Sequence, residues 1–257
     1  MSFSDADAAG AWNAGADAFN TFVESGADYY RIEVHGPALV TACEPVRDRA
    51  VLDLGCGQGY FSRQLASRAA AVDAIDISAE LLAHAKAHEA RAPLGIRYRL
   101  LSAADVATAW PPRHFDLVTA CMSLQDMADV PRTLQASAAV LRDGGRMVFS
   151  VPHPATDPLF REWERDASGR KRSLKLDRYF DTGPAVCDWN MPRLAAHWSS
   201  PCWRHTLSEW TQLVGDAGFV IRHLHEPRPT AEQVTANPHL DDCRRMPYFL
   251  IFDLSTR

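Results

Sequence analysis

One stretch of the chain decides its fold: Val51-Leu52-Asp53-Leu54-Gly55-Cys56-Gly57-Gln58-Gly59-Tyr60-Phe61. It reads as a buried strand, a glycine-rich turn and the start of a helix, and glycines allow the backbone of such a turn to approach a ligand closely. The helix start offers free N–H groups and the positive end of the helix dipole. The glycine spacing is G-x-G-x-G, with Tyr60 where the dinucleotide fingerprint needs its third glycine. The loop therefore predicts a nucleotide-type ligand other than NAD.

The sequence around this loop alternates short apolar runs with helical patterns, which is typical of a parallel sheet with helices on both faces. Strands are expected at Ala50–Leu54, Ala71–Ile75, Ile96–Leu101, Phe115–Cys121 and Arg146–Val151, and later at Phe219–His225 and Tyr248–Leu254. Helices are expected at about 60–67, 79–90 and 131–141, the last closed by a turn at 143–145, and another after the capping box at 206–209. The predicted fold class is α/β with a doubly wound, mostly parallel sheet.

An acidic residue, Asp76, ends the second expected strand. In a doubly wound sheet this position lies at the carboxyl ends of the strands, where a carboxylate can accept hydrogen bonds from both hydroxyls of a ribose. The segment 102–105 follows the third strand and is sited for a polar contact to an adenine edge. The alternative is that the glycines form an ordinary tight turn and that Asp76 caps the helix beginning at Ala79.

These residues together resemble the class I S-adenosylmethionine-dependent methyltransferases, whose first motif is an acidic residue followed by G-x-G-x-G, here Asp53 and residues 55–59. The resemblance extends over roughly residues 28–151 and includes Asp76, the strand beginning at Phe115 and the segment 141–146. It implies a seven-stranded sheet, S-adenosyl-L-methionine as the cofactor and methyl transfer as the reaction. The chain is also similar to a bacterial small-molecule branch of the family, through segments 28–31 and 122–127, His153-Pro154 and the end of its insert.

The resemblance implies a set of cofactor contacts along the chain. They are Tyr30, Arg31, Asp53, Gly55, Cys56, Gly57, Gly59, Asp76, Ile77, Ala104, Asp105, Cys121 and Met122. Arg31 carries a planar fork of donors that suits the cofactor's carboxylate, and the alternative is an exposed arginine on an amphipathic helix. Residues 1–49 are expected to form a helical lid, and residues 50–151 the cofactor-binding half.

Residues 152–205 are expected to form an insert that caps the acceptor, before residues 206–257 close a single domain with a helix and strands. The insert is aromatic-rich, and such aromatics line an apolar pocket or give the insert a small core of its own. Its Tyr179, Trp198 and Arg204, together with Gln125 after the fourth strand, are predicted to bind the acceptor. The basic run 161–178 is interpreted as a solvated face, with an anionic acceptor as the alternative.

Methyl transfer from a sulfonium depends mainly on aligning the reacting groups, so a base is optional. A phenol or alcohol acceptor gains from a base with a pKa near neutrality, which histidine provides. His153, after the fifth strand, and His205, at the end of the insert, are the candidates, and the alternative for each is a structural hydrogen bond. The predicted acceptor is a small-molecule metabolite methylated on oxygen or nitrogen. The alternatives are a protein or RNA acceptor, use of the cofactor without methyl transfer, and a binding protein without turnover.

Composition narrows the choice of partners. A net charge of −5 disfavours binding to nucleic acid, and no signal segment or long apolar run indicates export or a membrane. The six cysteines form no C-x-x-C pair, so we expect a cytoplasmic protein with reduced thiols. Cys187, Cys202, His153 and His205 match no compact zinc module, and no metal is predicted. The expected oligomeric state is a monomer or homodimer.

Overall fold

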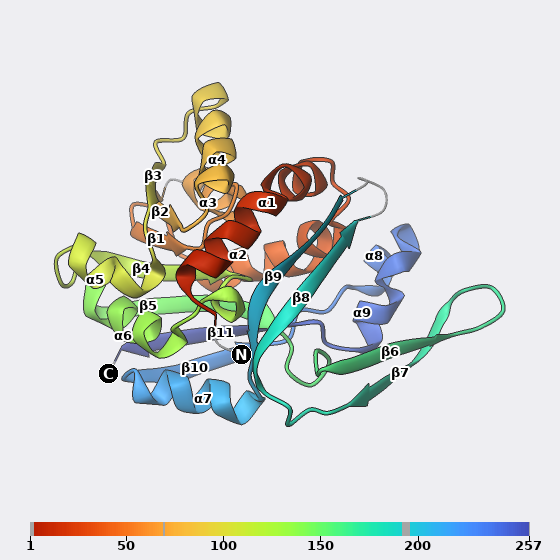
Figure 1. The fold of residues 1–257 in the computed structure, drawn as a ribbon. Helices are drawn as coiled ribbons and strands as arrows, with labels where there is room; N and C mark the ends of the chain where they lie inside the picture. The colour runs from red at the N-terminus through yellow and green to blue at the C-terminus, as the bar shows by residue number, and fades with distance from the viewer. Residues whose placement is uncertain (1–2, 69, 192–195, 257) are drawn as a thin grey trace.

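The computed structural model describes residues 3–68, 70–191 and 196–256, and its centre is a seven-stranded sheet (Figure 1). The order is β3-β2-β1-β4-β5-β11-β10, formed by β1 (Ala50–Leu54), β2 (Ala71–Asp76), β3 (Arg97–Leu100), β4 (Phe115–Cys121), β5 (Leu141–Pro152), β10 (Phe219–His225) and β11 (Phe249–Thr256). The first five strands pair in parallel, and β11 runs antiparallel to both β5 and β10. The predicted α/β fold with a mostly parallel seven-stranded sheet is confirmed.

Helices bury both faces of the sheet. On one face the core includes residues of α2 (Gly36–Cys43), α3 (Tyr60–Ala66) and α4 (Ala79–Arg91), and on the other face residues of α5 (Val106–Ala109), α6 (Val130–Val140) and α7 (Leu207–Asp216). Central strands of such a sheet need apolar residues on both sides, which explains the near-continuous apolar run of β1. The capping box predicted from Thr206 to Glu209 is present at the start of α7.

The start of β5 differs from the prediction. A turn was expected at residues 143–145, with the strand beginning at Arg146, but the strand begins at Leu141. Gly144 has a φ of 73°, and the pairing of β4 with β5 shifts register between Phe115 and Leu117. The glycines therefore form an irregularity within the paired strand, because a bulge accommodates the extra residues without ending the ladder.

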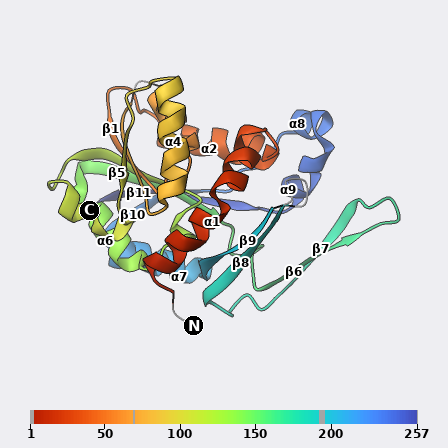
Figure 2. The same cartoon turned by 45° about the horizontal axis from the view of Figure 1, so that its top comes forward.

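The insert contains two hairpins that its sequence did not reveal. They are β6 (Phe160–Arg165) with β7 (Lys171–Asp177), and β8 (Gly183–Met191) with β9 (Ala196–Arg204). In Figures 1 and 2 the β6–β7 hairpin points away from the sheet, whereas β8 and β9 lie beside α1 (Asp5–Glu24). Most side chains of β6 and β7 are exposed on both faces, so the alternation that marks a half-buried strand is missing. Two short helices, α8 (Ala231–Ala236) and α9 (Asp241–Arg245), precede β11.

Helix α1 connects the sheet to the insert. It begins with a capping box between Ser4 and Asp7, contacts α4 on one side and packs against β9 on the other. Where it meets β9, Gly15 lies directly against the ring of Trp198. No helix in the described part of the chain is long and apolar enough to cross a membrane.

Candidate active site

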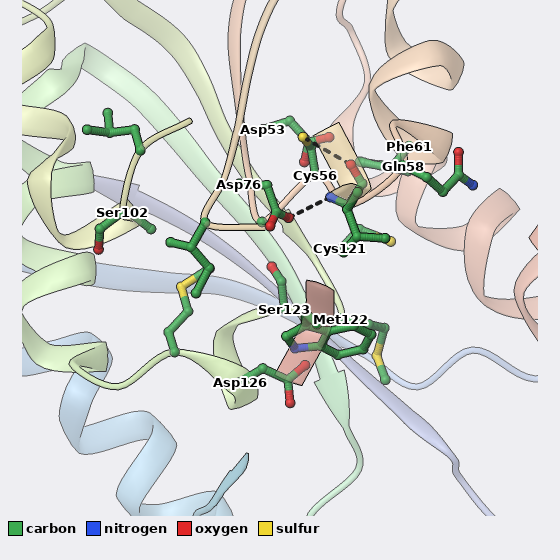
Figure 3. Close-up of a pocket in the computed structure, with 18 of the residues that line it drawn as sticks. Asp53, Cys56, Gln58, Phe61, Asp76, Ser102, Cys121, Met122, Ser123 and Asp126 are labelled. Carbon is green, nitrogen blue, oxygen red and sulfur yellow. Dashed lines mark hydrogen bonds between the residues drawn. The ribbon is translucent and has the colours of Figure 1, made fainter. Parts of the chain in front are cut away.

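A first cavity of about 950 Å³ lies at the carboxyl ends of the parallel strands (Figure 3). Its wall includes the glycine loop after β1, the ends of β2 and β4, the segment after β3, and one face of α1. In Figure 3, Asp53, Cys56 and Asp76 lie on one side of the cavity and Ser123 and Asp126 on the opposite side. The topology therefore brings residues from four separate strand ends to one site.

The glycine loop packs so closely that two of its positions exclude a side chain. Gly55 has a φ of 62°, and a Cβ there would lie 2.6 Å from the Cβ of Ser123. Gly59 has a φ of 86° and precedes α3, and a Cβ there would lie 2.4 Å from the hydroxyl of Tyr98. Both residues adopt the left-handed conformation that glycine tolerates best, so the loop turns sharply between β1 and α3.

Two buried carboxylates face the first cavity. Asp76 accepts hydrogen bonds from the backbone N–H of Gly57 at 2.7 Å and of Ser78 at 2.8 Å, and burial raises its pKa although these bonds oppose the shift. Asp53 accepts a bond at 2.5 Å from the Oγ of Ser62, and burial raises the pKa of Asp53 to about 7. Within the described residues, the second oxygen of Asp53 has no hydrogen-bond partner. The cavity is therefore suited to a ligand that brings hydroxyl or amino groups.

Arg31 also lines the first cavity. Its Nε donates to Asp28 at 2.8 Å, and its Nη1 lies 3.7 Å from the sulfur of Cys121. The guanidinium carbon is 5.7 Å from the ring centroids of both Phe19 and Tyr60. These contacts fix the orientation of the Arg31 guanidinium within the first cavity.

The structure brings most of the predicted cofactor residues together. Those that line the first cavity are Arg31, Asp53, Gly55, Cys56, Gly57, Asp76, Ile77, Ala104, Cys121 and Met122. Three others do not line it, and each has another structural role. Tyr30 donates its hydroxyl to Asp242 at 2.6 Å, Asp105 pairs with Arg132 at 2.6 Å, and Gly59 forms the turn into α3. The placement of Tyr30 and Asp105 corrects the sequence-based expectation.

Other residues of the first cavity were missed by the sequence reasoning. At the end that follows β3, the Oγ of Ser102 donates to Asp5 at 2.5 Å, so the polar group nearest the predicted adenine position comes from α1. Trp12 and Phe19 of α1 also line the wall. Their spacing of seven residues on a helix was a usable signal, because it places both rings on one face.

A second cavity of about 890 Å³ lies between the sheet and the β8–β9 hairpin. Its wall combines residues of α1, the loops after β4 and β5, β8 and β9, and the start of α7: Trp12, Phe19, Arg31, Met122, Gln125, Asp126, Val151, Pro152, Pro154, Asp157, Cys187, Trp189, Cys202, Trp203, Arg204, His205 and Trp210. Five of these residues, namely Trp12, Phe19, Arg31, Met122 and Asp126, line the first cavity as well. The two cavities therefore meet at a shared wall, which we call the junction.

Several polar groups of the second cavity have no partner in the part of the chain that the structure describes. They are the Nε and Nη1 atoms of Arg204, the Nε2 of His205 and the Oε1 of Gln125, all buried. Burial lowers the pKa of His205, so its imidazole is neutral at pH 7. Asp126 accepts a bond at 3.0 Å from the amide of Gln125, and burial raises the pKa of Asp126 well above its usual range. Asp126 is the ionisable residue at the junction that the sequence reasoning missed, although it stands next to the predicted Gln125.

Three residues predicted for the acceptor or for catalysis lie outside both cavities. His153 has both ring nitrogens engaged, one 2.8 Å from Glu226 and the other accepting from the N–H of Ala155 at 3.2 Å. The hydroxyl of Tyr179 accepts from the N–H of Leu207 at 2.9 Å, at the start of α7. Trp198 is buried against α1 and stacks on Trp189, with ring centroids 5.4 Å apart and planes within 2°. The structure thus places these three side chains in contact with other parts of the protein and outside both cavities, and their predicted contacts with ligands stay predictions.

Among residues 3–68, 70–191 and 196–256, no group of three or more His, Cys, Asp or Glu side chains is placed to hold a metal ion. Cys187 and Cys202 have their sulfur atoms 2.9 Å apart, but His153 is held elsewhere by Glu226.

Known proteins resemble both the sequence and the fold. A family model described as a methyltransferase domain matches residues 52–149. The solved structure of an S-adenosylmethionine-dependent methyltransferase from Mesorhizobium loti is 31% identical, covers 85% of this chain and 96% of its own, and superposes with a TM-score of 0.70. The chain belongs to the S-adenosylmethionine-dependent methyltransferases.

Further relatives of this methyltransferase agree with that family. A solved structure from Listeria monocytogenes is 25% identical, covers 87% of this chain and 96% of its own, and has a TM-score of 0.71. The ubiquinone biosynthesis O-methyltransferase of Nitrosomonas europaea is 34% identical over 104 residues, which are 40% of this chain and 44% of that enzyme. The chain thus matches less than half the length of this curated relative. The predicted family and its cofactor, S-adenosyl-L-methionine, are confirmed.

The first cavity of this methyltransferase fits that cofactor chemically. The unpaired oxygen of Asp53 suits an ammonium group, the carboxylate of Asp76 suits ribose hydroxyls, and the fork of Arg31 suits a carboxylate. The cofactor carries all three groups. The aromatic rings and apolar side chains of the wall suit its adenine and thioether carbon atoms.

Proposed function

We propose that this methyltransferase transfers a methyl group from S-adenosylmethionine to an oxygen or nitrogen of a small molecule bound in the second cavity. The observation that carries the proposal is the junction, where five residues line both cavities. A cofactor in the first cavity and an acceptor in the second would meet there. The name of the Nitrosomonas europaea relative, an O-methyltransferase, supports a hydroxyl oxygen as the acceptor atom.

The reaction needs alignment and exclusion of water. The cofactor, when bound, supplies a methyl group whose bond to a sulfonium sulfur breaks as its bond to the acceptor atom forms, leaving a neutral sulfide. Trp12 and Phe19 cover the junction, their rings 5.4 Å apart, and Trp189 packs against both. These rings exclude water and restrict the approach of the acceptor, and alignment of this kind contributes about 7–11 kcal/mol in well-oriented systems.

Asp126 is the proposed acceptor of the proton that a hydroxyl releases. It lines both cavities, whereas His205 lines only the second. Burial raises the pKa of Asp126, which makes its carboxylate a stronger base than an exposed aspartate. The amide of Gln125 donates to Asp126 and to the carbonyl oxygen of Met122, and so holds the carboxylate at the junction. His205 then serves to position the acceptor.

The shape of the second cavity favours a small molecule over a protein or RNA. Part of its wall is formed by α1 and the β8–β9 hairpin, and the chain has a net charge of −5. A polyanion would be repelled by that charge, and a flat macromolecular surface would not reach the junction. A cytoplasmic location and a monomeric or homodimeric state stay predictions.

The first experiment is calorimetric titration of the purified protein with S-adenosylmethionine and S-adenosylhomocysteine, followed by a screen of hydroxylated and amine acceptors with labelled methyl groups. Asp76→Ala should abolish micromolar binding of both cofactor forms, because it removes the carboxylate at the end of β2. Asp105→Ala is the matched control, since Asp105 is paired with Arg132 outside the cavity and its loss should leave the affinity unchanged. A wild-type protein that is folded and free of carried-over ligand, yet binds neither form, would refute the proposal.

A further inference from the structure

Arg204 is a half-buried cation with two enclosed N–H donor atoms that have no hydrogen-bond partner in the described residues. It ends β9 and lines the second cavity, and its Nε and Nη1 are enclosed with no partner in the described residues. A guanidinium is always charged, and enclosing it without a counter-charge is costly unless a ligand supplies one. The position of Arg204 therefore indicates that its guanidinium binds a group of a ligand and does not stabilise the fold.

The acidic side chains around the cavity make no hydrogen bond or ion pair with Arg204 in the described residues, although Asp157 is close enough to attract its charge. Asp157 pairs with Arg161 at 3.3 Å, and Asp126 is held by the amide of Gln125. Burial raises the pKa of Asp157 and of Asp126, and the charges of Arg161 and Arg204 oppose the shift at Asp157. No salt bridge joins Arg204 to a carboxylate within the described residues.

The other two basic side chains that line the second cavity, Arg31 and His205, do not need a charged ligand in that cavity. Arg31, at the junction, is paired with Asp28. His205, next to Arg204, is neutral because burial lowers its pKa. Arg204 is therefore a cation of the second cavity that has no directly bonded carboxylate in the described residues, and it lies at the part of the wall that the first cavity does not share.

The aromatic residues of the wall indicate the shape and polarity of the part of the ligand that carries no charge. Trp203 is next to Arg204 in β9, Trp189 lines the same cavity from further along β8, where it pairs with Trp198, and Trp210 lines it from α7. Rings at this density suit a flat apolar molecule, because such a molecule replaces water over their faces. The guanidinium of an arginine can donate two parallel hydrogen bonds to a carboxylate.

We propose that the acceptor is a planar, aromatic carboxylic acid whose carboxylate binds the guanidinium of Arg204 while its nucleophilic atom faces Asp126 at the junction. This inference rests on the proposed function, since it assumes that the second cavity holds the acceptor. It assigns the acidic group and the methylated group to opposite ends of the molecule. It does not depend on the exposed basic run of β6 and β7, where Arg172 and Lys175 are already paired with acidic neighbours.

The test compares pairs of probes that differ only in charge: benzoate with benzamide, phenylacetate with phenylacetamide, and 4-hydroxybenzoate with 4-hydroxybenzamide. Calorimetric titration is run with and without saturating S-adenosylhomocysteine. In the wild type the acid of at least one pair should bind about tenfold more tightly than its amide. This is the gain in affinity expected from a charge-assisted hydrogen bond between a carboxylate and a guanidinium. Arg204→Gln should bring the two Kd values of that pair together, and Arg204→Lys should keep part of the preference.

The controls separate this inference from the proposed function. Arg165→Gln removes an exposed arginine of β6, whose Nη1 contacts only the carbonyl of Gly169, and should keep the full preference for the acid. Arg204→Gln should bind S-adenosylhomocysteine like the wild type, because Arg204 does not line the first cavity. Equal Kd values within every pair for the wild type, or a preference that survives in Arg204→Gln, would overturn the inference and leave the methyltransferase proposal intact. A wild-type protein that cannot bind S-adenosylhomocysteine would instead overturn the proposed function. The probe titrations run in the absence of S-adenosylhomocysteine would still decide the role of Arg204.

Discussion

Replacing Gly15 with alanine should destabilise the protein, although the same change in a helix usually stabilises. Alanine is favoured over glycine in a helix interior by about 1 kcal/mol. At Gly15, however, the new Cβ would lie 2.3 Å from Cε2 of Trp198 and 2.5 Å from Cδ2 and Nε1. The ring cannot retreat easily because it stacks on Trp189. Overpacking of this kind costs about 1–3 kcal/mol, so the net effect of Gly15→Ala is a loss of up to about 2 kcal/mol.

Gly10 provides a control on the same helix, because no atom lies within 4 Å of the Cβ that an alanine would add there. Gly10→Ala should raise the free energy of unfolding by about 1 kcal/mol, so the two variants should differ by about 1–3 kcal/mol, at about 2–4 °C of Tm for each kcal/mol. Urea unfolding and thermal scans measure the difference. Gly15→Ala should also weaken binding of S-adenosylhomocysteine, because Trp12 and Phe19 on the same helix line the first cavity. Equal stability of the two variants would refute the packing of α1 against β9.

Three further predictions concern charged groups. Asp126→Asn should lower kcat by about 10²–10⁴-fold with any hydroxyl acceptor and change the Kd for S-adenosylhomocysteine much less, because the amide keeps the shape of the side chain in the wall of the first cavity; a normal kcat would exclude Asp126 as the base. Burial raises the pKa of Asp53 to about 7 in the folded state, whereas the unfolded chain loses this proton near pH 3.8, so stability falls as the pH rises between these values. Asp53→Asn should remove this contribution to the pH dependence of the free energy of unfolding, which is at most about 1.4 kcal/mol per pH unit. If the free energies of unfolding of the variant and the wild type change with pH by the same amount from pH 4 to 7, the prediction is wrong. Arg204→Met should raise the free energy of unfolding by about 1–3 kcal/mol, because it removes two enclosed N–H donor atoms that have no partner in the described residues, and a lower Tm would show that Arg204 supports the fold.

The sheet and the glycine loop could be predicted because their signals are local. β1 is an apolar run that ends at glycines, and the bounds expected for β1, β4 and β10 are those observed. Asp76 was found in the same way, since a residue at the end of a parallel strand has a fixed place at the sheet edge. Such inferences need only the order of residues in one segment.

The wall of the second cavity could not be predicted because it is assembled from distant segments. Trp12 meets Trp189 of the insert at 5.3 Å, a contact that only the complete fold creates. The sequence placed aromatic rings in the insert but could not distinguish Trp189, which faces the cavity, from Trp198 behind it. His153 stands at the expected sheet edge, yet its ring turns toward Glu226, because side-chain direction after a strand depends on tertiary contacts.

The division of the chain also explains which properties can be transferred from relatives. The family model ends at residue 149, before the β6–β9 hairpins, so the residues that the β8–β9 hairpin contributes to the second cavity, Trp189 and Arg204 among them, come after it. The cofactor site depends chiefly on the matched region, but five residues at the junction also line the second cavity. A change in α1 or in the β8–β9 hairpin therefore alters acceptor selection first and cofactor affinity second. For that reason the acceptor should be identified from the chemistry of Arg204 and its tryptophan neighbours, and not from the substrates of proteins that match only the first half of the chain.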